Sequence, residues 1–167
     1  MIFKFLNKNF YISFSIVALI YFLDRLSKIF VIQLDKNILG SEIFSSAYLN
    51  IVLIWNKGIA FGLFSFDESH LYNILTLLIS IIVVILVIMS LKSEGFKRYS
   101  LLMIVGGALG NLHDRIFSNV VPDFIDFHVG NFHWFIFNVS DIFITLGVIS
   151  MIVLELADNK TKEQNND

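Results

Sequence analysis

The sequence has no cysteine and only one proline, Pro122, among its 167 residues. Without cysteine, a disulfide, a thiolate metal site and a cysteine nucleophile are all excluded, and the chain cannot itself be acylated on cysteine. Charged residues are scarce at 16 %, and the net charge of −2 gives no indication of a nucleic-acid partner. Soluble domains usually carry about 25 % charged residues, so this chain is not an ordinary soluble protein.

Hydrophobic residues are abundant instead, at 56 % with a mean hydropathy of +0.76. They gather in four runs, and a membrane span needs roughly 20 apolar residues. The third run reaches that length only if the helix continues past His113. The sequence predicts an all-α membrane protein, a single integral membrane domain over residues 1–167. We expect four transmembrane helices at about 10–34, 71–91, 99–117 and 134–157, an outer-face loop at 35–70 and a disordered tail at 158–167.

The first run also resembles a cleaved signal peptide, because Lys4 and Lys8 precede it. No small-residue cleavage site follows, and apolar residues resume through Val31, so we expect an uncleaved span. Basic residues in short loops favour the cytoplasmic side. They place both termini and the 92–98 turn in the cytoplasm, and the loops 35–70 and 113–133 outside. The outer loop should hold a strand at Ala47–Trp55 and an interfacial segment at Gly58–Phe66.

Ionisable residues inside an apolar run are expensive in lipid and mark functional sites. Asp141 lies near the start of the fourth run and shares a helix face with Asn138, three residues earlier. The alternative interpretation is a helix N-cap. Asn111, Asp114 and Arg115 share a face at the end of the third run. Asp114 and Arg115 also fit a plain charge pair at the membrane surface.

Two further carboxylates, Asp123 and Asp126, lie among large apolar residues in the second outer loop. If this segment is extended, they point to opposite faces, so one turns inward and the other stays solvated. Both could also belong to a solvated loop. Two carboxylates from different segments at the outer face suggest a paired-acid site that retains one proton.

A metal site is the competing interpretation, because His113, Asp114, His128 and His133 are near in sequence. There is no HExxH pattern and no histidine pair at i, i+4 within an expected helix. We therefore expect no catalytic metal, with the histidines at the interface.

Five ordered motifs resemble those of the lipoprotein signal peptidase (type II signal peptidase) family across about residues 15–155. These motifs are Asp24-Arg-Leu-Ser-Lys28, Trp55-Asn-Lys-Gly-Ile-Ala-Phe-Gly62, Gly106 to Arg115, Val121-Pro-Asp-Phe-Ile-Asp126 and Phe137-Asn-Val-Ser-Asp141. The resemblance implies a bacterial inner-membrane aspartic endopeptidase with a small strand-rich cradle at its outer face. It implies Asp123 and Asp141 as the catalytic residues. The supporting polar residues would be Asn111, Arg115, Asn138, Asn56, Gly58, Asp24 and Lys28.

The implied reaction is cleavage of prolipoproteins just before the diacylglyceryl-modified cysteine, next to membrane lipids, by a monomer without metal or cofactor. Two positions depart from the family pattern. Asn119 stands where glycine is usual, and Asn tolerates a left-handed backbone. Pro122 directly precedes Asp123 and lacks a backbone donor. Two other classes fit the residues alone: a small transporter with Asp24 and Asp141 as ion relays, and a scaffold that works through its Gly106–Gly110 pair.

Overall fold

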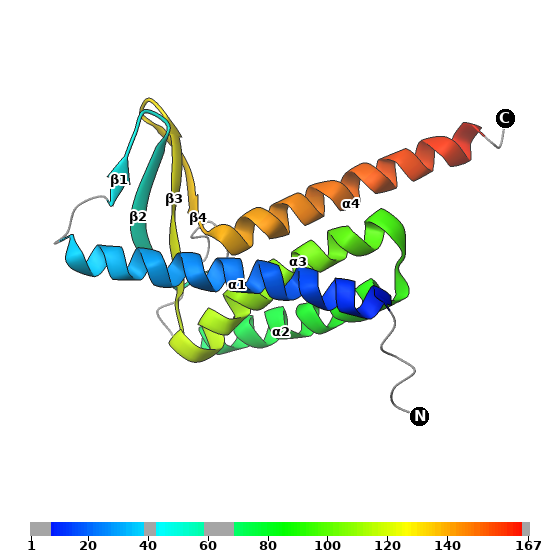
Figure 1. The fold of residues 1–167 in the computed structure, drawn as a ribbon, viewed down its shortest axis with the longest axis horizontal. Coiled ribbons are helices and arrows are strands. Elements are labelled where there is room, and N and C mark those ends of the chain that lie inside the picture. The colour runs from blue at the N-terminus through cyan, green and yellow to red at the C-terminus, as the bar shows by residue number, and fades with distance from the viewer. Residues whose placement is uncertain (1–7, 39–42, 59–68, 165–167) are drawn as a thin grey trace.

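The computed structural model describes residues 8–38, 43–58 and 69–164, which form long helices and one small sheet (Figure 1). The helices in these ranges are α1 (Lys8–Asn37), α2 (Ser69–Lys92), α3 (Gly95–Ser118) and α4 (Val139–Gln164). The strands are β1 (Phe44–Ser45), β2 (Leu49–Asn56), β3 (Val121–Val129) and β4 (Phe132–Phe137). They pair in the order β1-β2-β3-β4, and every pairing is antiparallel.

Each predicted span contains a helix, but two boundaries differ from the prediction. Residues 134–137, predicted to open the fourth span, belong to β4, and α4 begins only at Val139. An apolar run suits either structure, and polar capping at Asn138 decides where the helix starts. The tail predicted to be disordered from 158 is helical through Gln164, because Lys, Glu and Gln are good helix formers. Residues 165–167 lie outside the described ranges.

Among the residues that the structure describes, two helical segments are long and apolar enough to cross a membrane, His70–Lys92 and Val139–Asp158. Helices α1 and α3, which the sequence also predicts as spans, carry more charge. Much of that charge faces the interior: Asp24 and Lys28 of α1 and Asp114 and Arg115 of α3 are buried. Composition therefore identifies α2 and α4 as possible spans. It does not identify α1 and α3, whose buried charged residues lower their mean hydropathy.

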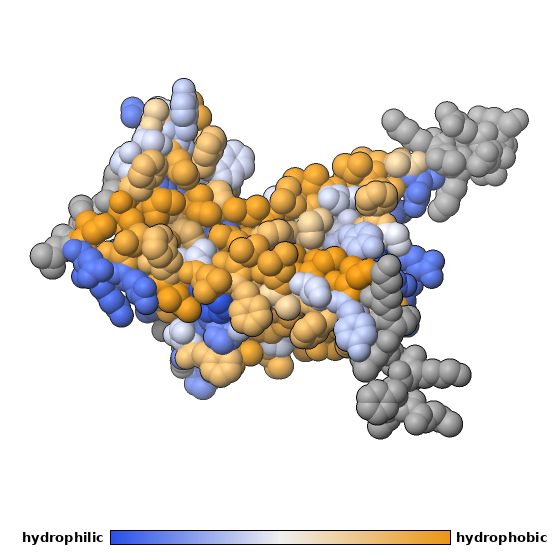
Figure 2. Space-filling view, viewed as in Figure 1, coloured by the Kyte–Doolittle hydropathy of each residue, from blue (hydrophilic) through white to orange (hydrophobic). Residues whose placement is uncertain are grey.

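The outer surface of the helices is strongly apolar, as Figure 2 shows over the helical body. Large side chains on α1, α2 and α4 are more than half exposed, among them Phe14, Leu26, Ile74, Leu77 and Ile152. Contiguous exposed apolar surface of this kind marks an interaction site, commonly with membrane.

Helix α3 is the centre of the bundle and packs against α1, α2 and α4. Its glycines permit this close packing, as the Gly106–Gly110 spacing predicts. A Cβ at Gly106 would lie 2.9 Å from the Cβ of Ile20 on α1. A Cβ at Gly110 would collide with the Oγ of Ser140 on α4 and lie 2.6 Å from Asp24. The two glycines thus allow α1, α3 and α4 to pack closely against one another.

The sheet stands at one end of the helices, while α1 begins and α4 ends at the opposite end (Figure 1). The strand predicted at Ala47–Trp55 is confirmed as β2, one to two residues further along. The interfacial segment predicted at Gly58–Phe66 lies outside the described residues from position 59 onward. The predicted loop 113–133 consists of the last turn of α3 and most of a β-hairpin.

The two departures from the family pattern fit this hairpin. Asn119 caps α3 in the left-handed conformation, with φ 56° and ψ 14°, as expected for a residue that replaces glycine. Pro122 pairs with Trp55 of β2, whereas the pairing with β4 begins only at Ile125. The missing N–H of Pro122 therefore leaves no gap in the β3–β4 ladder.

Candidate active site

Asp141 lies in the first turn of α4, where it forms a reciprocal cap with Asn138. The backbone N–H of Asn138 donates to Asp141 Oδ2 at 3.1 Å, and the N–H of Asp141 donates to Asn138 Oδ1 at 3.2 Å. This is the geometry of a capping box. Asn138 occupies the N-cap position and Asp141 is the third residue of the helix, so Asp141 takes part in the cap without being the N-cap itself. The same contacts fix the orientation of a buried carboxylate.

Asp123 lies on β3 and is only 3 % exposed. Its two oxygens accept hydrogen bonds from the amides of Asn138 at 2.6 Å and Asn56 at 2.8 Å. Burial raises the pKa of Asp123 to about 6. The amide of Asn56 opposes this increase, and the nearby carboxylate of Asp141 adds to it. An acid held this way binds a proton more readily than a solvated one.

Asn138 connects the two carboxylates, because its side-chain amide binds Asp123 while its backbone N–H binds Asp141. Each of the four carboxylate oxygens accepts one hydrogen bond from an asparagine, the fourth being Asp141 Oδ1 from Asn111 at 2.9 Å. A carboxylate oxygen has two lone pairs, so each retains one for another partner. The structure therefore brings together the two aspartates that the sequence places in different segments.

A buried network extends from this pair to α1. The carbonyl of Asn111 accepts a hydrogen bond from Lys28 Nζ at 2.9 Å. Lys28 also lies 2.7 Å from Asp114 and 2.9 Å from Asp24. Asp24 in turn accepts the backbone N–H of Ser140 at 3.1 Å. The predicted Asp24–Lys28 pair is thus present, but both residues are buried, so it is not a plain interfacial ion pair.

Arg25 is the network residue that the sequence reasoning misses. Its guanidinium binds both oxygens of Asp114, at 2.5 and 2.6 Å, and Asp24 at 2.9 Å. Asp114 therefore faces α1 and does not form the predicted surface pair with Arg115. The detectable signal was the position of Arg25 between Asp24 and Lys28, one charged residue among three in an apolar run.

Arg115 instead holds the outer loop where it leaves β2. Its guanidinium donates to the carbonyl of Gly58 at 2.6 Å and lies 5.8 Å from the ring centre of Tyr72. The N–H of Gly58 donates to Asn56 Oδ1 at 2.7 Å. Asn56 therefore links the loop to Asp123, and all nine predicted site residues belong to connected contacts around the aspartate pair or the loop beside it.

Asp126 departs from the prediction that one of the two outer-loop carboxylates is solvated. It is 5 % exposed and contacts His133, whose Nδ1 lies 2.9 Å from Asp126 Oδ2. A register shift between Asp126 and His128 and a second one in β2 disturb the simple alternation. Asp126 and two histidines are also the described residues that could hold a metal ion together.

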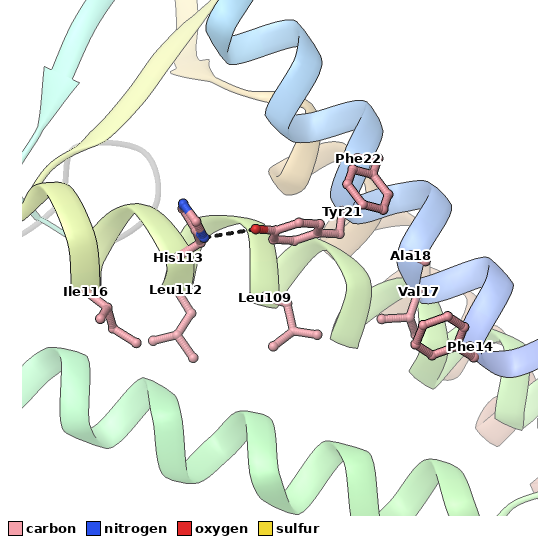
Figure 3. A pocket seen from close by; sticks show the side chains of 9 residues that line it. All are labelled: Phe14, Val17, Ala18, Tyr21, Phe22, Leu109, Leu112, His113 and Ile116. Atoms are coloured by element: carbon pink, nitrogen blue, oxygen red, sulfur yellow. Dashed lines mark hydrogen bonds between the residues drawn. The ribbon is translucent and has the colours of Figure 1, made fainter.

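Apolar cavities lie along the described parts of the helices. One of about 310 Å³ opens beside Asp141 and is lined by Trp134, Phe137, Ile142, Thr145 and Leu146. Another, of about 410 Å³, lies between α1 and α3, where Tyr21 Oη is 2.9 Å from His113 Nδ1 (Figure 3). No carboxylate lines this second cavity, whereas Asp141 lines the first.

The fold is similar to those of two solved structures, each described as a bacterial membrane enzyme. The first, determined by the in meso method at 2.3 Å, has a TM-score of 0.74 and 30 % sequence identity, with 90 % of each chain covered. The second, at 1.9 Å, has a TM-score of 0.69 and 29 % identity, covering 87 % of this chain and 93 % of the other. The class defined by the fold is therefore that of a bacterial membrane enzyme.

Residues 16–157 match the family model described as signal peptidase (SPase) II. The chain belongs to this family of peptidases. Two similar relatives are named lipoprotein signal peptidase. The one from Pelagibacter ubique is 48 % identical over 95 % of this chain and 96 % of the relative. The one from Anaplasma phagocytophilum is 39 % identical, over 87 % and 92 %.

Proposed function

We propose that this protein is an aspartic endopeptidase that removes the signal peptide from prolipoproteins immediately before the diacylglyceryl-modified cysteine. Asp123 and Asp141 would be its catalytic pair. The observation that carries the proposal is the contact of both buried carboxylates with one residue, Asn138. The substrate class follows from the family and from the name of its relatives.

In the proposed reaction the aspartate pair holds one shared proton, because two close carboxylates do not both ionise readily. The ionised member takes a proton from a water molecule, which attacks the scissile carbonyl. The protonated member donates to the carbonyl oxygen, so a tetrahedral intermediate forms without a covalent enzyme adduct. Asn56, Asn111 and Asn138 hold both carboxylates in place throughout.

The proposal places all four helices across the bacterial inner membrane, with both termini cytoplasmic and the aspartate pair near the outer face. The exposed apolar side chains on α1, α2 and α4 support this placement. So does the arrangement in Figure 1, in which α1 begins and α4 ends far from the sheet. A monomer suffices, because one chain supplies both aspartates and all their hydrogen-bond donors.

The cavity beside Asp141 is the proposed entry for apolar parts of the substrate. Its walls are almost entirely hydrophobic, and Asp141 is the ionisable residue among them. A lipid-linked substrate would reach it from the membrane, between β4 and α4. Arg115 holds Gly58, which binds Asn56, and Asn56 in turn binds Asp123.

The decisive experiment compares wild type, Asp123→Asn and Asp141→Asn on a diacylglyceryl-modified prolipoprotein in detergent. Cleavage is followed as a mobility shift, and mass spectrometry locates the new N-terminus. We expect cleavage before the lipidated cysteine in wild type and loss of at least about 10³-fold in each variant, as for other essential acid–base groups. Asp158→Asn, an exposed carboxylate at the far end of α4, is the matched control and should cleave normally.

An excess of chelator should slow the wild type far less than either aspartate substitution does, since the proposed chemistry uses no catalytic metal. Near-full activity in either variant would exclude the aspartate pair as catalytic. An inactive wild type on several lipidated substrates would exclude the proposed reaction and return the transporter and scaffold classes to consideration.

A further inference from the structure

A second polar cluster lies on the sheet, formed by Asp126, His128 and His133. Asp126 and His128 are two residues apart on β3, and His133 is the cross-strand partner of His128 on β4. One donor atom from each residue lies within 4.8 Å of the others. The three side chains therefore share one face of the β3–β4 hairpin, and none of them contacts Asp123 or Asp141 in the described contacts.

The side chains of this cluster lie in close contact. His133 Nδ1 lies 3.0 and 2.9 Å from the two oxygens of Asp126. The rings of His128 and His133 stack with centroids 4.9 Å apart and planes inclined by 20°. Asn50 on β2 donates to Asp126 Oδ2 at 3.3 Å, which holds the carboxylate from the other side.

The contact between His133 and Asp126 does not provide a hydrogen-bond partner for His128. His128 is only 9 % exposed, and its Nδ1 is buried without a hydrogen-bond partner among the described residues. Buried polar atoms normally have a partner, and an exception requires an explanation. A cation shared by the three residues would satisfy the carboxylate and both rings.

We propose that Asp126, His128 and His133 bind a divalent transition-metal ion, with Zn²⁺ as the best fit, and that this ion fastens the β3–β4 hairpin. Two imidazoles and a carboxylate are ligands that Zn²⁺ accepts, whereas Ca²⁺ and Mg²⁺ prefer oxygen alone. Three protein ligands leave a fourth position for water. Asn50 would orient the ligating carboxylate, as supporting residues do in metal sites.

The donor spacing suits such an ion. Zinc–ligand bonds of about 2.0–2.2 Å in a tetrahedron separate the ligand atoms by somewhat more than 3 Å. The observed 2.9 Å between His133 Nδ1 and Asp126 Oδ2 needs only a few tenths of an ångström of expansion. The sequence offers both histidines as possible metal ligands together with His113 and Asp114, but it is the hairpin that brings residues 128 and 133 next to Asp126.

The test uses the full-length protein in detergent, freed of any histidine tag and of metal. Zn²⁺ is titrated against a chromophoric chelator, and thermal unfolding is recorded with and without Zn²⁺. We expect one tight ion per chain in wild type and a higher Tm when it binds. Asn50→Ala should weaken binding about 10-fold, and His133→Ala by more than about 100-fold, because loss of a ligand exceeds loss of its support.

His133 has a half-exposed side chain, so its replacement tests binding without threatening the fold. His70→Ala, which removes an exposed histidine at the start of α2, is the matched control and should bind Zn²⁺ like wild type. Asp141→Asn should also bind normally. The proposal is overturned if wild type shows no saturable binding, if His133→Ala binds as tightly as wild type, or if Asp141→Asn abolishes binding.

Discussion

Helices α2 and α3 have the same length of 24 residues but opposite compositions. Between Leu71 and Leu91, α2 carries no acidic or basic residue, and most of its large side chains are exposed. Helix α3 carries glycines and charged residues, yet it is the most buried helix and packs against the other three. The comparison shows that the composition of a helix in this bundle depends on where the helix lies. The central helix can carry charged residues because it does not face the surrounding medium.

The two helices are consequently stabilised by different interactions. The apolar side chains of α2 need no specific partner outside the protein. The charges of α3 need partners inside it, and Asp114 finds Arg25 and Lys28 on α1. Removing a charge from this network should therefore have a large effect, whereas an equivalent change on α2 should have almost none.

The largest effect is expected for Lys28→Met. Lys28 is 1 % exposed and lies between Asp24, Asp114 and Asn111. Its loss leaves buried carboxylates with less compensation, which typically costs about 3–5 kcal/mol. Peptidase activity should fall as well, because Asn111 loses the partner that orients it toward Asp141. Reversible unfolding in mixed micelles measures the first effect and the cleavage assay the second.

The matched control is Lys92→Met at the exposed end of α2, which should change stability by no more than about 0.5 kcal/mol. Equal stabilities of the two variants would show that the charges on α3 do not depend on α1. The difference between central and peripheral helices would then be one of composition alone.

The sequence predicts the parts of this structure that depend on local pattern. The apolar runs predict helices, Ala47–Trp55 predicts β2, and the glycine spacing predicts the close approach at Gly106 and Gly110. Asn119 tolerates the left-handed turn, as expected. The motif resemblance, which covers most of the chain, supplies the nine candidate site residues, which stay a prediction, and the family that the comparisons identify.

What depends on tertiary pairing was not predictable. Asp114 could pair with its neighbour or with another helix, and only the packing of α1 against α3 selects Arg25 and Lys28. Simple alternation predicts that one of Asp123 and Asp126 is solvated, but both are buried, because the sheet has register shifts that alternation ignores. The start of α4 was placed too early, since the apolar residues 134–137 suit a strand as well as a span.

The second effect concerns pH. The apolar stretch of α2 has no carboxylate, histidine or basic residue, and Asp123 on β3 is one source of pH dependence near neutral pH. Its pKa rises from 3.8 to about 6 on folding because of burial. The folded state then binds more protons between these values, so this residue makes stability fall as pH rises from about 4 to 6 and has a constant effect above 6.

Asp123→Asn should remove this contribution. Between pH 4 and pH 7, the free energy of unfolding of the variant should rise by about 3 kcal/mol relative to that of wild type. Each unit of pKa shift corresponds to about 1.4 kcal/mol. Unfolding curves collected at several pH values measure it, with Glu155→Gln, an exposed carboxylate of α4, as the matched control. Parallel pH profiles for wild type and Asp123→Asn would contradict the raised pKa.

The smallest effect tests the packing of α3 directly. In Gly110→Ala the new Cβ would collide with the Oγ of Ser140 and lie 2.6 Å from Asp24 Oδ2. Overpacking of this kind costs about 1–3 kcal/mol, although alanine itself favours a helix. Val84→Ala on the exposed side of α2 changes two carbon atoms, whereas Gly110→Ala adds one. It should nevertheless cost less than about 0.5 kcal/mol. If Val84→Ala proved the more harmful change, α2 would be held by specific contacts, and the contrast between the two helices would fail.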